Sequence, residues 1–594
     1  MDPYAKQHIL KATQATEIES TQLIQKLWND YGVLQRVYLK GGNVQSVILK
    51  HIRLPLEQSH PKGFNSAHAK QRKIKSYQVE TSWYQDYNPI NLQDNGSRTA
   101  HCLASFQKAD EFFILLEDLD TTGYSRRLTH ANWAAIQVVL AWLACFHAKF
   151  MGYQPNGLWN TGSYWHLKTR PDELQALEDP HLRNAAPLID EKLNNTPYLT
   201  LIHGDAKLAN FCFSEDAHQV AAVDFQYIGH GCGMKDVAYF IGSCLDEEAA
   251  EHLEEEILTY YFKVLSHHLQ DSPIDTDDLQ TQWRALYPFA WADFHRFLKG
   301  WSPDHWKINS YSEKTTQKVM ESIQNELLTT ATTAAVKAGK LIRNYWKKEF
   351  EVMKKAGSSR SAQIVTEVDV LSQEIILAEL SPSMHSYGLG LLTEEEQDTG
   401  NRLTQPYFWS IDPLDGTLFF SEGKSGFAVS IALISQTGET QLGVVYDPVS
   451  ETLYHAVRGQ GCFKNHVRFH TTAHTAHTDD LHLFVDRSLK EAPNYTDLEN
   501  SFTLHFTGGA VINTLQVLNH PNACYFKYPK EAVGGCAIWD LAAIALIVQE
   551  AGGIITGFAG QELTYNRAET LYFNQEGLMI CSHPSMPDKL RSTL

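Results

Sequence analysis

Little in the 594-residue sequence suits secretion or a membrane. Its nine cysteines are scattered, odd in number and without a C-x-x-C pair, which is typical of free thiols in a reducing compartment. The first residues, MDPYAKQHIL, lack the basic-then-apolar order of a signal peptide. The longest apolar stretch, residues 133–146, is shorter than the roughly 20 residues that span a bilayer. We therefore expect a cytoplasmic protein without a membrane-spanning helix.

Positive charge is also scarce. Lys and Arg number 50 against 69 Asp and Glu, which gives a formal net charge of -19. Nucleic-acid phosphates and anionic lipids are both bound by basic surfaces, so we expect neither a nucleic-acid polymer nor a membrane surface as a partner. Apolar residues make up 43% of the chain, a fraction typical of folded globular proteins. The length predicts more than one domain.

The pattern of elements changes in the middle of the chain. In the first half, Gly41 and Gly42 separate two short β-branched segments, 35–40 and 45–52, which predicts a hairpin. Helical spacing follows over 75–87, 132–150 and about 236–300.

Gly, Pro and Asn residues interrupt this helical pattern over 300–316, and a new long helix is predicted over 321–346. The second half has glycine-rich turns, β-rich runs and a late helix over 539–553. We therefore predict two domains, 1–315 and 316–594.

The first motif with chemical meaning is HGDAKLAN at residues 203–210, followed by Asp224-Phe225-Gln226. Phosphoryl transfer from ATP needs a carboxylate beside the attacking hydroxyl, and Asn and Asp oxygens that hold Mg²⁺ on the phosphates. Two short loops that each follow a strand can deliver these groups to one point. We interpret His203 as a residue that orients its own loop.

This pattern resembles the aminoglycoside and choline phosphotransferases, and most of all the ecdysteroid kinase-like branch, over about residues 20–315. The resemblance implies a protein-kinase-like bilobal α+β fold that uses ATP and Mg²⁺ to phosphorylate an alcohol group. It implies Asp205 as the catalytic base, Asn210 and Asp224 as Mg²⁺ ligands, and Lys207 near the transferred phosphate.

The resemblance also implies an ATP site. Lys50 resembles the strand lysine that holds the α- and β-phosphates, with Glu80 as its ion-pair partner. The hinge that meets adenine through its backbone would be the segment from Glu117 to Leu119. No G-x-G-x-x-G loop precedes Lys50, only the turn at Gly41-Gly42, so the phosphate-covering residues stay unassigned. Because of this departure, an alternative stays open in which the domain binds nucleotide but catalyses phosphoryl transfer poorly.

The second motif is Asp412-Pro413-Leu414-Asp415-Gly416-Thr417, with acids upstream at Glu394 and downstream at Asp540. Clustered carboxylates repel one another unless cations offset them, and hard oxygen ligands select Mg²⁺. Two such ions suit in-line attack of water on a phosphomonoester. The backbone N–H groups of Gly416 and Thr417, directly after the acids, are candidates for cradling the phosphate.

This second pattern resembles the inositol monophosphatase superfamily, which includes the 3'(2'),5'-bisphosphate nucleotidases, over about residues 320–590. The resemblance implies a layered α/β sugar-phosphatase fold. It implies that Thr417 and Glu394 position the nucleophilic water, and that Asp369 supports this water or a third metal. The implied metal ligands are Glu394, Asp412, the Leu414 carbonyl, Asp415 and Asp540.

Two segments have alternative interpretations, so the identities of the substrates stay open. The segment 525–530 departs from the usual substrate loop and would either hold a ring and a second phosphate or form a half-buried strand. The aromatic residues of 282–301 would be helical core or, in part, the wall of the kinase substrate pocket.

We predict a bifunctional fusion of a small-molecule kinase and a Mg²⁺-dependent phosphomonoesterase. The phosphatase substrate would be an inositol phosphate, a sugar phosphate or a 3'-phosphonucleotide. The alternative is a phosphatase regulated by a weak ATP-binding module. We expect only small-molecule substrates as ligands and leave a homodimer open.

Overall fold

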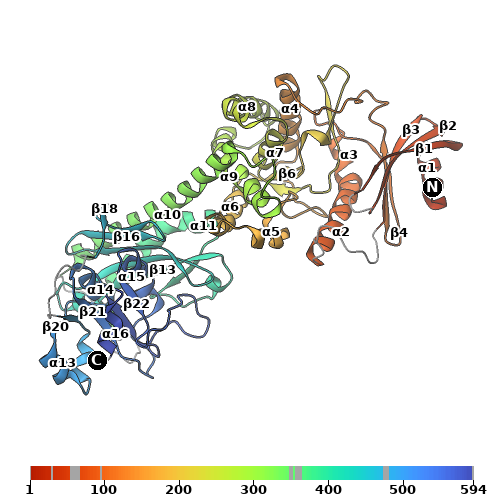
Figure 1. Cartoon of the computed structure of the whole chain (residues 1–594). Coiled ribbons are helices and arrows are strands. Elements are labelled where there is room, and N and C mark those ends of the chain that lie inside the picture. Colours follow the sequence, from red (N-terminus) through yellow and green to blue (C-terminus); the bar gives the residue numbers. More distant parts are fainter. Residues whose placement is uncertain are drawn as a thin grey trace. The chain divides into compact units, whose positions relative to one another are not determined.

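The structure is a computed structural model of the chain, and the residues it describes are 2–27, 31–53, 67–93, 96–346, 352–354, 364–471 and 481–591. Internal contacts divide the chain into two units, Met1–Glu321 and Ser322–Leu594. Each unit has its own sheets (Figure 1). Each also has its own apolar core. The division falls inside helix α10 (Ser310–Tyr345), and the predicted domain boundary at 315/316 stays a prediction.

Unit 1 begins with an antiparallel five-stranded sheet in the order β1-β2-β3-β5-β4. Its strands are β1 (Glu17–Lys26), β2 (Gly32–Lys40), β3 (Ser46–Arg53), β4 (Cys102–Lys108) and β5 (Glu111–Glu117). The predicted hairpin is confirmed, because β2 and β3 pair around Gly41 and Gly42. A Cβ on Gly42 would lie 2.9 Å from that of Ala15, so the turn packs tightly on the segment after helix α1 (Pro3–Thr13).

A mostly helical part follows the sheet. Its helices are α2 (Ala67–Ser82), α3 (Asn88–Asn91), α4 (Trp133–Lys149), α5 (Pro171–Ala176), α6 (Pro180–Asn194), α7 (Met234–Cys244), α8 (Glu247–His268) and α9 (Thr276–Trp301). The helices predicted over 75–87 and 132–150 are confirmed by α2, which continues as a π-helical turn, and by α4. Two short antiparallel pairs complete the unit: β6 (Thr200–Ile202) with β9 (Gly229–Gly231), and β7 (Phe211–Phe213) with β8 (Val220–Ala222).

Helix α10 begins earlier than predicted. The Asn309 side chain accepts the N–H of Ser312 at 3.0 Å, and the Ser312 hydroxyl accepts the N–H of Asn309 at 3.1 Å. This reciprocal pair satisfies two backbone donors at the helix start and places the first helical residue at Ser310. The prediction of a non-helical segment over 300–316 is therefore wrong for residues 310–316. Asn309 caps a helix there, whereas the sequence pattern treated it as a helix breaker.

Unit 2 contains two large sheets. The first has seven strands in chain order, parallel between β12 and β13 and antiparallel elsewhere. They are β12 (Gly390–Thr393), β13 (Tyr407–Asp415), β14 (Ala428–Ser435), β15 (Thr440–Asp447), β16 (Thr452–Val457), β17 (Gly461–Lys464) and β18 (Val467–Phe469). The second sheet has the order β20-β19-β21-β23-β22. Its strands are β19 (His482–Phe484), β20 (Thr503–His505), β21 (Ala523–Lys527), β22 (Ile554–Thr556) and β23 (Leu578–Cys581), and a separate pair joins β10 (Val352–Lys354) to β11 (Ile364–Thr366).

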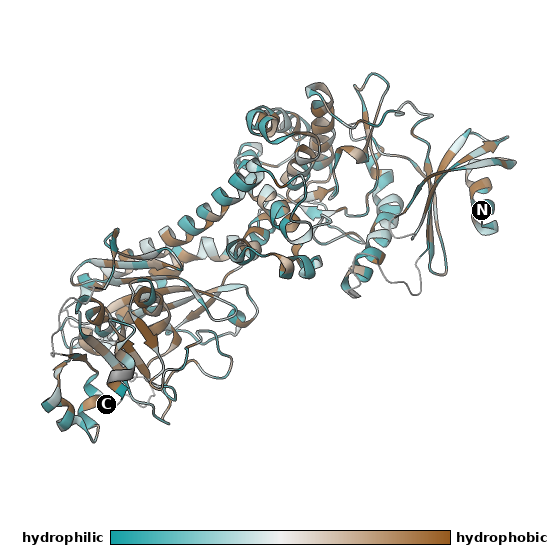
Figure 2. Ribbon diagram, viewed as in Figure 1, coloured by the Kyte–Doolittle hydropathy of each residue, from teal (hydrophilic) through white to brown (hydrophobic). Residues whose placement is uncertain are grey.

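Helices make this unit a layered α/β structure. They are α11 (Glu367–Tyr387), α12 (Thr417–Ser421), α13 (Tyr495–Ser501), α14 (Ala510–Asn519), α15 (Ile538–Glu550) and α16 (Met586–Arg591). Helix α15 contacts strands β13 to β17 and also β22, and α14 contacts both sheets, so the two helices lie between them. Helix α15 is apolar nearly all round, as a helix buried on both sides must be (Figure 2). None of the helices described in either unit has the length and hydropathy that a membrane crossing requires.

Candidate functional sites

In unit 1 the loop that follows β6 is held by a buried acid. The Asp236 carboxylate, on α7, accepts the N–H of His203 at 2.6 Å and that of Gly204 at 2.9 Å. Gly204 has φ +75°, and a Cβ there would lie 2.1 Å from the carbonyl of Tyr227, so only glycine fits. The ring of His203 contacts the carbonyl of Val223, which ties its loop to the one that carries Asp224. Sequence reasoning missed Asp236, whose only signal was an acid at the start of the helical run DVAYFIGSCL.

Asp205 is brought together with two other predicted site residues. It is buried, and its Oδ2 accepts Lys207 Nζ at 2.9 Å and Asn210 Nδ2 at 3.0 Å. Its Oδ1 is also buried and has no hydrogen-bond partner within the described part of the chain. One oxygen of this carboxylate is thus fixed while the other is left to accept a proton or to contact a cation.

The second group joins β3, α2 and the loop after β8. Lys50 Nζ lies 2.7 Å from Glu80 Oε1 and 3.0 Å from Asp224 Oδ1. Burial alone would raise the pKa of Asp224, but Lys50, Lys207 and Lys73 together outweigh it and hold this pKa well below its usual range. Asp224 has φ +70°, an uncommon conformation for a residue other than glycine. The three predicted residues therefore form one ion-pair network.

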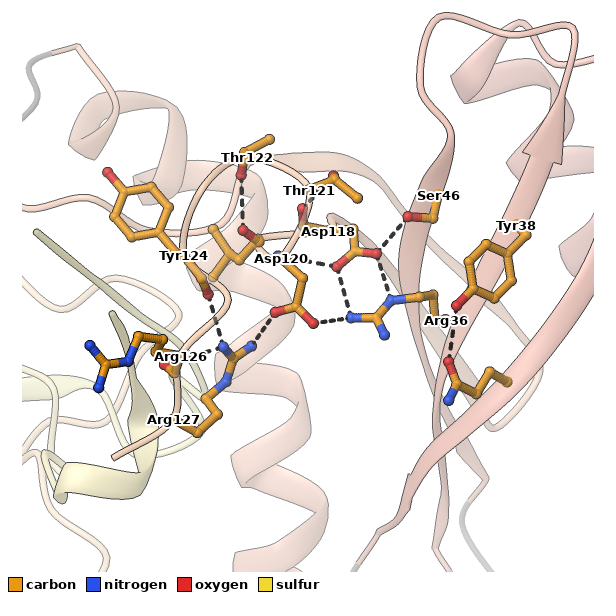
Figure 3. Close-up of polar contacts among 12 residues, drawn as sticks. Arg36, Tyr38, Ser46, Asp118, Asp120, Thr121, Thr122, Tyr124, Arg126 and Arg127 are labelled. Atoms are coloured by element: carbon orange, nitrogen blue, oxygen red, sulfur yellow. Dashed lines mark hydrogen bonds and ion pairs between the residues drawn. The ribbon is translucent and has the colours of Figure 1, made fainter. Parts of the chain in front are cut away.

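The segment after β5 is bound to the sheet by charged side chains (Figure 3). Arg36 Nε on β2 and Ser46 Oγ on β3 each lie 2.6 Å from Asp118 Oδ2. Arg36 also pairs with Asp120, which in turn pairs with Arg127 at 3.0 Å. These contacts hold the predicted adenine hinge against the two strands that lead to Lys50.

Two backbone groups of the predicted hinge are already used. The N–H of Glu117 donates to the carbonyl of His101 at 2.9 Å, and the carbonyl of Leu119 accepts from Tyr124 at 2.9 Å. Of these two groups, the N–H of Glu117 is not available to a base, and contact of this segment with adenine stays a prediction.

The predicted kinase residues of unit 1 line one cavity of about 1140 Å³. Its wall includes Lys50, Asp205 and Asp224, together with residues 22–25 of β1. Gly41 and Gly42 are not part of the wall, because they pack against the end of α1. The Gly41-Gly42 turn is therefore not the element that covers this cavity. Strand β1, which does line it, was not predicted, because most of its side chains are exposed and lack a clear apolar alternation.

In unit 2 three carboxylates converge. Glu394 directly follows β12, Asp412 lies on β13 and Asp540 lies in the first turn of α15; their ligand oxygens are all within 4.8 Å of one another. Asp412 Oδ1 accepts the N–H of Leu414 at 2.9 Å. Its Oδ2 is buried and finds no hydrogen-bond partner among the residues that the structure describes. An orphaned carboxylate oxygen facing two further acids is the arrangement expected of a cation site.

The electrostatics of these acids also fit a divalent cation. Burial, together with the charges of Glu394 and Asp540, raises the pKa of Asp412 well above its usual range. Burial and the charge of Asp540 raise the pKa of Asp415 to about 7, and burial raises that of Asp540. Several buried carboxylates cannot all be ionised at neutral pH unless positive charge offsets them. Their all-oxygen chemistry suits Mg²⁺.

The remaining predicted residues of the second motif lie around this group. The pairing of β13 with β14 is irregular between Asp412 and Asp415, which allows both acids to leave the regular ladder. Asp415 lies outside the three-carboxylate group, and its Oδ2 accepts the N–H of Val511 at the start of α14 at 2.9 Å. The carbonyl of Leu414 accepts the hydroxyl of Thr417 at 3.1 Å.

Gly416 and Asp369 complete the predicted set. Gly416 has φ +87° and precedes α12, which starts at Thr417. Asp369 is buried in the first turn of α11. One turn further on, Ser372 donates to the carbonyl of Pro413 at 2.8 Å, so this face of α11 lies against β13. Asp369 therefore projects from the helix face that borders the motif.

The first half of segment 525–530 belongs to strand β21, which ends at Lys527. Tyr525 and Phe526 are buried in β21, so they are not placed to hold a substrate ring, and the half-buried strand is the interpretation that the structure favours. Lys527 pairs with Asp486 at 2.8 Å, and the Tyr525 hydroxyl donates to Asp486 at 3.0 Å. Sequence reasoning missed Asp486, which has no local motif around it. The Lys527 charge acts to lower the pKa of Asp415.

Comparison with known proteins bears on both units. The inositol monophosphatase family model matches residues 323–587, and the ecdysteroid kinase-like family model matches residues 160–273. The fructose-1,6-bisphosphatase/inositol-1-monophosphatase of Thermotoga maritima is 30% identical over 236 residues, 38% of this chain and 82% of that protein. The Nus factor SuhB of Escherichia coli K12 is 33% identical over 242 residues, 39% of this chain and 86% of that protein.

Among solved structures, the extragenic suppressor protein suhB of Bartonella henselae is 27% identical, with a TM-score of 0.37, over 44% of this chain and 96% of that one. The two curated relatives, each at least 30% identical over more than four fifths of its length, show that this chain belongs to the inositol monophosphatase family. Members of the family are in general Mg²⁺-dependent, which agrees with the acidic group of unit 2. The ecdysteroid kinase-like match includes Asp205 and Asp224 but not Lys50.

Proposed function

We propose that the chain is a bifunctional enzyme, in which unit 2 hydrolyses a small phosphomonoester and unit 1 phosphorylates a small alcohol with ATP. The observation that carries the first activity is the convergence of Glu394, Asp412 and Asp540, with an orphaned oxygen on Asp412. The second activity is supported by Asp205 and the network of Lys50 and Asp224, which line one cavity.

In the phosphatase, Glu394, Asp412 and Asp540 would hold Mg²⁺, with Asp415 and the Leu414 carbonyl completing the set. Bound divalent ions would lower the pKa of water and offset the charge of the phosphate. Thr417 and Glu394 would orient the attacking water, and the N–H groups of Gly416 and Thr417 would face the phosphate oxygens. Inositol and sugar phosphates are favoured as substrates by the name of the Thermotoga maritima relative, and 3'-phosphonucleotides stay an alternative.

The phosphatase proposal is tested by Asp412→Asn. A metal ligand supports several kcal/mol of transition-state stabilisation, so phosphate release from inositol monophosphate should fall by at least about a hundredfold. Glu439→Gln, a change at an exposed acid of the same unit, is the matched control and should keep its activity. Retained activity in Asp412→Asn would refute the metal assignment.

In the kinase, Asp205 Oδ1 would accept the proton of the acceptor hydroxyl while Lys207 and Asn210 hold the opposite oxygen. The bond from the acceptor oxygen to the γ-phosphorus forms as the bond to ADP breaks. Lys50, oriented by Glu80, would contact the α- and β-phosphates. Asn210 and Asp224 would hold Mg²⁺, which offsets charge on the phosphates.

The kinase proposal is tested by ADP formation from ATP and Mg²⁺ over a panel of amino-alcohols, sugars and steroids. Asp205→Asn should lower ADP formation by at least about a hundredfold and leave ATP binding unchanged, because it removes the base but not the phosphate ligands. Asp216→Asn, on an exposed turn, is the control. Equal turnover by Asp205→Asn would exclude Asp205 as the base.

One observation favours the alternative, a phosphatase regulated by ATP. Asp224 Oδ1 accepts from both Lys50 and Gln226, so one oxygen of the proposed metal ligand is already used. ATP that binds and changes the rate of phosphate release, while no acceptor is phosphorylated, would support this alternative.

A further inference from the structure

Lys307 lies in the segment between α9 and α10, inside the cavity that also contains Asp205. Its Nζ is 4.6 Å from the ring centroid of Tyr239, 5.5 Å from that of Phe294 and 5.5 Å from that of Trp306. Three aromatic faces thus surround one ammonium group, at distances where cation–π attraction operates.

This ammonium has no negative partner of its own. Within the described part of the chain, Lys307 Nζ makes no hydrogen bond and no ion pair, whereas Lys50 and Lys207 each contact a carboxylate at 3.0 Å or less. Burial lowers the pKa of Lys307 to about 8, even though the charge of Asp205 acts to raise it. The aromatic rings offset only part of the cost of desolvation, so among the described residues the cavity holds a cation without an ion-pair partner.

The cavity also exposes two large aromatic side chains. Trp301 is 41% exposed and Trp306 is 64% exposed, and both line the cavity with Lys307. Aromatic rings bordering a cavity offer flat apolar surface to a ligand. Arg170, another cation of this wall, is already paired with Glu173 at 2.8 Å. Lys307 is therefore a cation of this wall that remains available to a ligand.

We propose that Lys307 binds an anionic group of the acceptor, so that unit 1 phosphorylates a hydroxylated ring compound bearing a carboxylate, phosphate or sulfate. The ring would lie against Trp301 and Trp306, with its hydroxyl toward Asp205. A built-in ammonium already occupies the aromatic faces, which disfavours cationic acceptors such as amino-alcohols. The inference rests on the proposed kinase function, because Asp205 defines the reacting end of the cavity.

The test compares two probes that differ in charge, 4-(hydroxymethyl)benzoate and neutral 4-(hydroxymethyl)benzamide. Their binding to the full chain is measured by calorimetry without Mg²⁺. The wild type and the control Lys299→Met, whose lysine lies outside the cavity wall and near Glu313, should bind the benzoate at least about tenfold more tightly. Lys307→Met should lose this preference and Lys307→Arg should keep it, which separates loss of charge from loss of folding.

Three results would overturn the proposal: no detectable binding of the benzoate, equal binding of both probes by the wild type, or an intact preference in Lys307→Met. The anion could also be a phosphate of ATP. Competition between benzoate and ATP, with ATP binding weakened in Lys307→Met, would assign Lys307 to the nucleotide and contradict the acceptor assignment.

Failure of the kinase function and failure of the anion site give different experimental results. If no compound of the alcohol panel yields ADP while the benzoate preference still depends on Lys307, the kinase function falls and the anion site stands. If ADP forms equally from neutral and anionic acceptors in wild type and Lys307→Met, the kinase function stands and the anion site falls.

Discussion

At the scale of single residues, Gly509 lies too close to the Asp415 carboxylate for any side chain to fit. Gly509 precedes α14 with φ −64°, a conformation that any residue can adopt. A Cβ at this position would nevertheless lie 2.4 Å from Asp415 Oδ2. The glycine is therefore needed for room, because the start of α14 approaches the second acid of the DPLDGT motif closely enough for Val511 to bind it.

Gly509→Ala should push the Asp415 carboxylate away from its place. If Asp415 is a metal ligand, the Mg²⁺ concentration for half-maximal phosphate release should rise by about tenfold or more. Gly400→Ala is the control, because its Cβ meets nothing within 4 Å although its φ is +76°. It should cost about 1 kcal/mol of stability and leave the Mg²⁺ dependence unchanged. An unchanged Mg²⁺ dependence in Gly509→Ala would place Asp415 outside the metal site.

At the scale of elements, α9 and the start of α10 are joined by a buried histidine. His295 on α9 lies with its Nδ1 3.0 Å from the hydroxyl of Ser312, the residue that also completes the cap of α10. Burial lowers the pKa of His295 to about 4. The unfolded chain takes up this proton at about pH 6.5 and the folded chain only near pH 4, so stability from this group is present above pH 6.5 and is lost as the pH falls.

Between pH 7 and pH 5 this histidine should lower the free energy of unfolding of unit 1 by about 2 kcal/mol. Urea unfolding of the full chain at both pH values measures the change. His295→Gln should have a correspondingly flatter pH dependence, while His252→Gln, at an exposed histidine of α8, should match the wild type. Parallel pH dependence of His295→Gln and wild type would show that His295 is not the titrating group.

At the scale of the whole molecule, each candidate site is built from one unit. The residues from Lys50 to Lys307 belong to the first unit, and those from Asp369 to Asp540 belong to the second. At least six of the acids behind the net charge of -19 would serve Mg²⁺ or phosphoryl chemistry in the proposed sites, so the formal charge would overstate the acidity of a metal-loaded protein. They are Asp205, Asp224, Glu394, Asp412, Asp415 and Asp540. Metal ions would supply the local positive field that anionic phosphates need.

Because the sites share no residue, the two activities should be separable in the full chain. Asp412→Asn should leave ADP formation within about twofold of wild type, and Asp205→Asn should do the same for phosphate release, as expected for changes at sites that share no residue. Both rates are measured on both variants. Phosphate release that responds to ATP in Asp205→Asn would instead support the regulated phosphatase.

The structure brings predicted site residues together where they belong to one short motif. Asp205, Lys207 and Asn210 lie within one loop, so their spacing alone brings them together. Asp236 and Asp486 were missed because each reaches its site through long-range packing and has no diagnostic neighbours. Lys307 lies in a segment, 300–311, that itself resembles the ecdysteroid kinase-like branch, but the segment does not show that this side chain reaches the cavity of Asp205. Strand β1 was missed for a related reason, since its exposed side chains carry no apolar alternation.

The sequence by itself determined the two motifs, their order and the family to which the second half belongs, because the types and spacing of ligating residues are local properties. Only the tertiary structure decided that Tyr525 and Phe526 are buried. It also decided that, within the described residues, Asp412 keeps an orphaned oxygen and Lys307 lies among three rings without an ion-pair partner. Burial and the absence of a partner depend on every segment that packs around a side chain, and no local pattern records them.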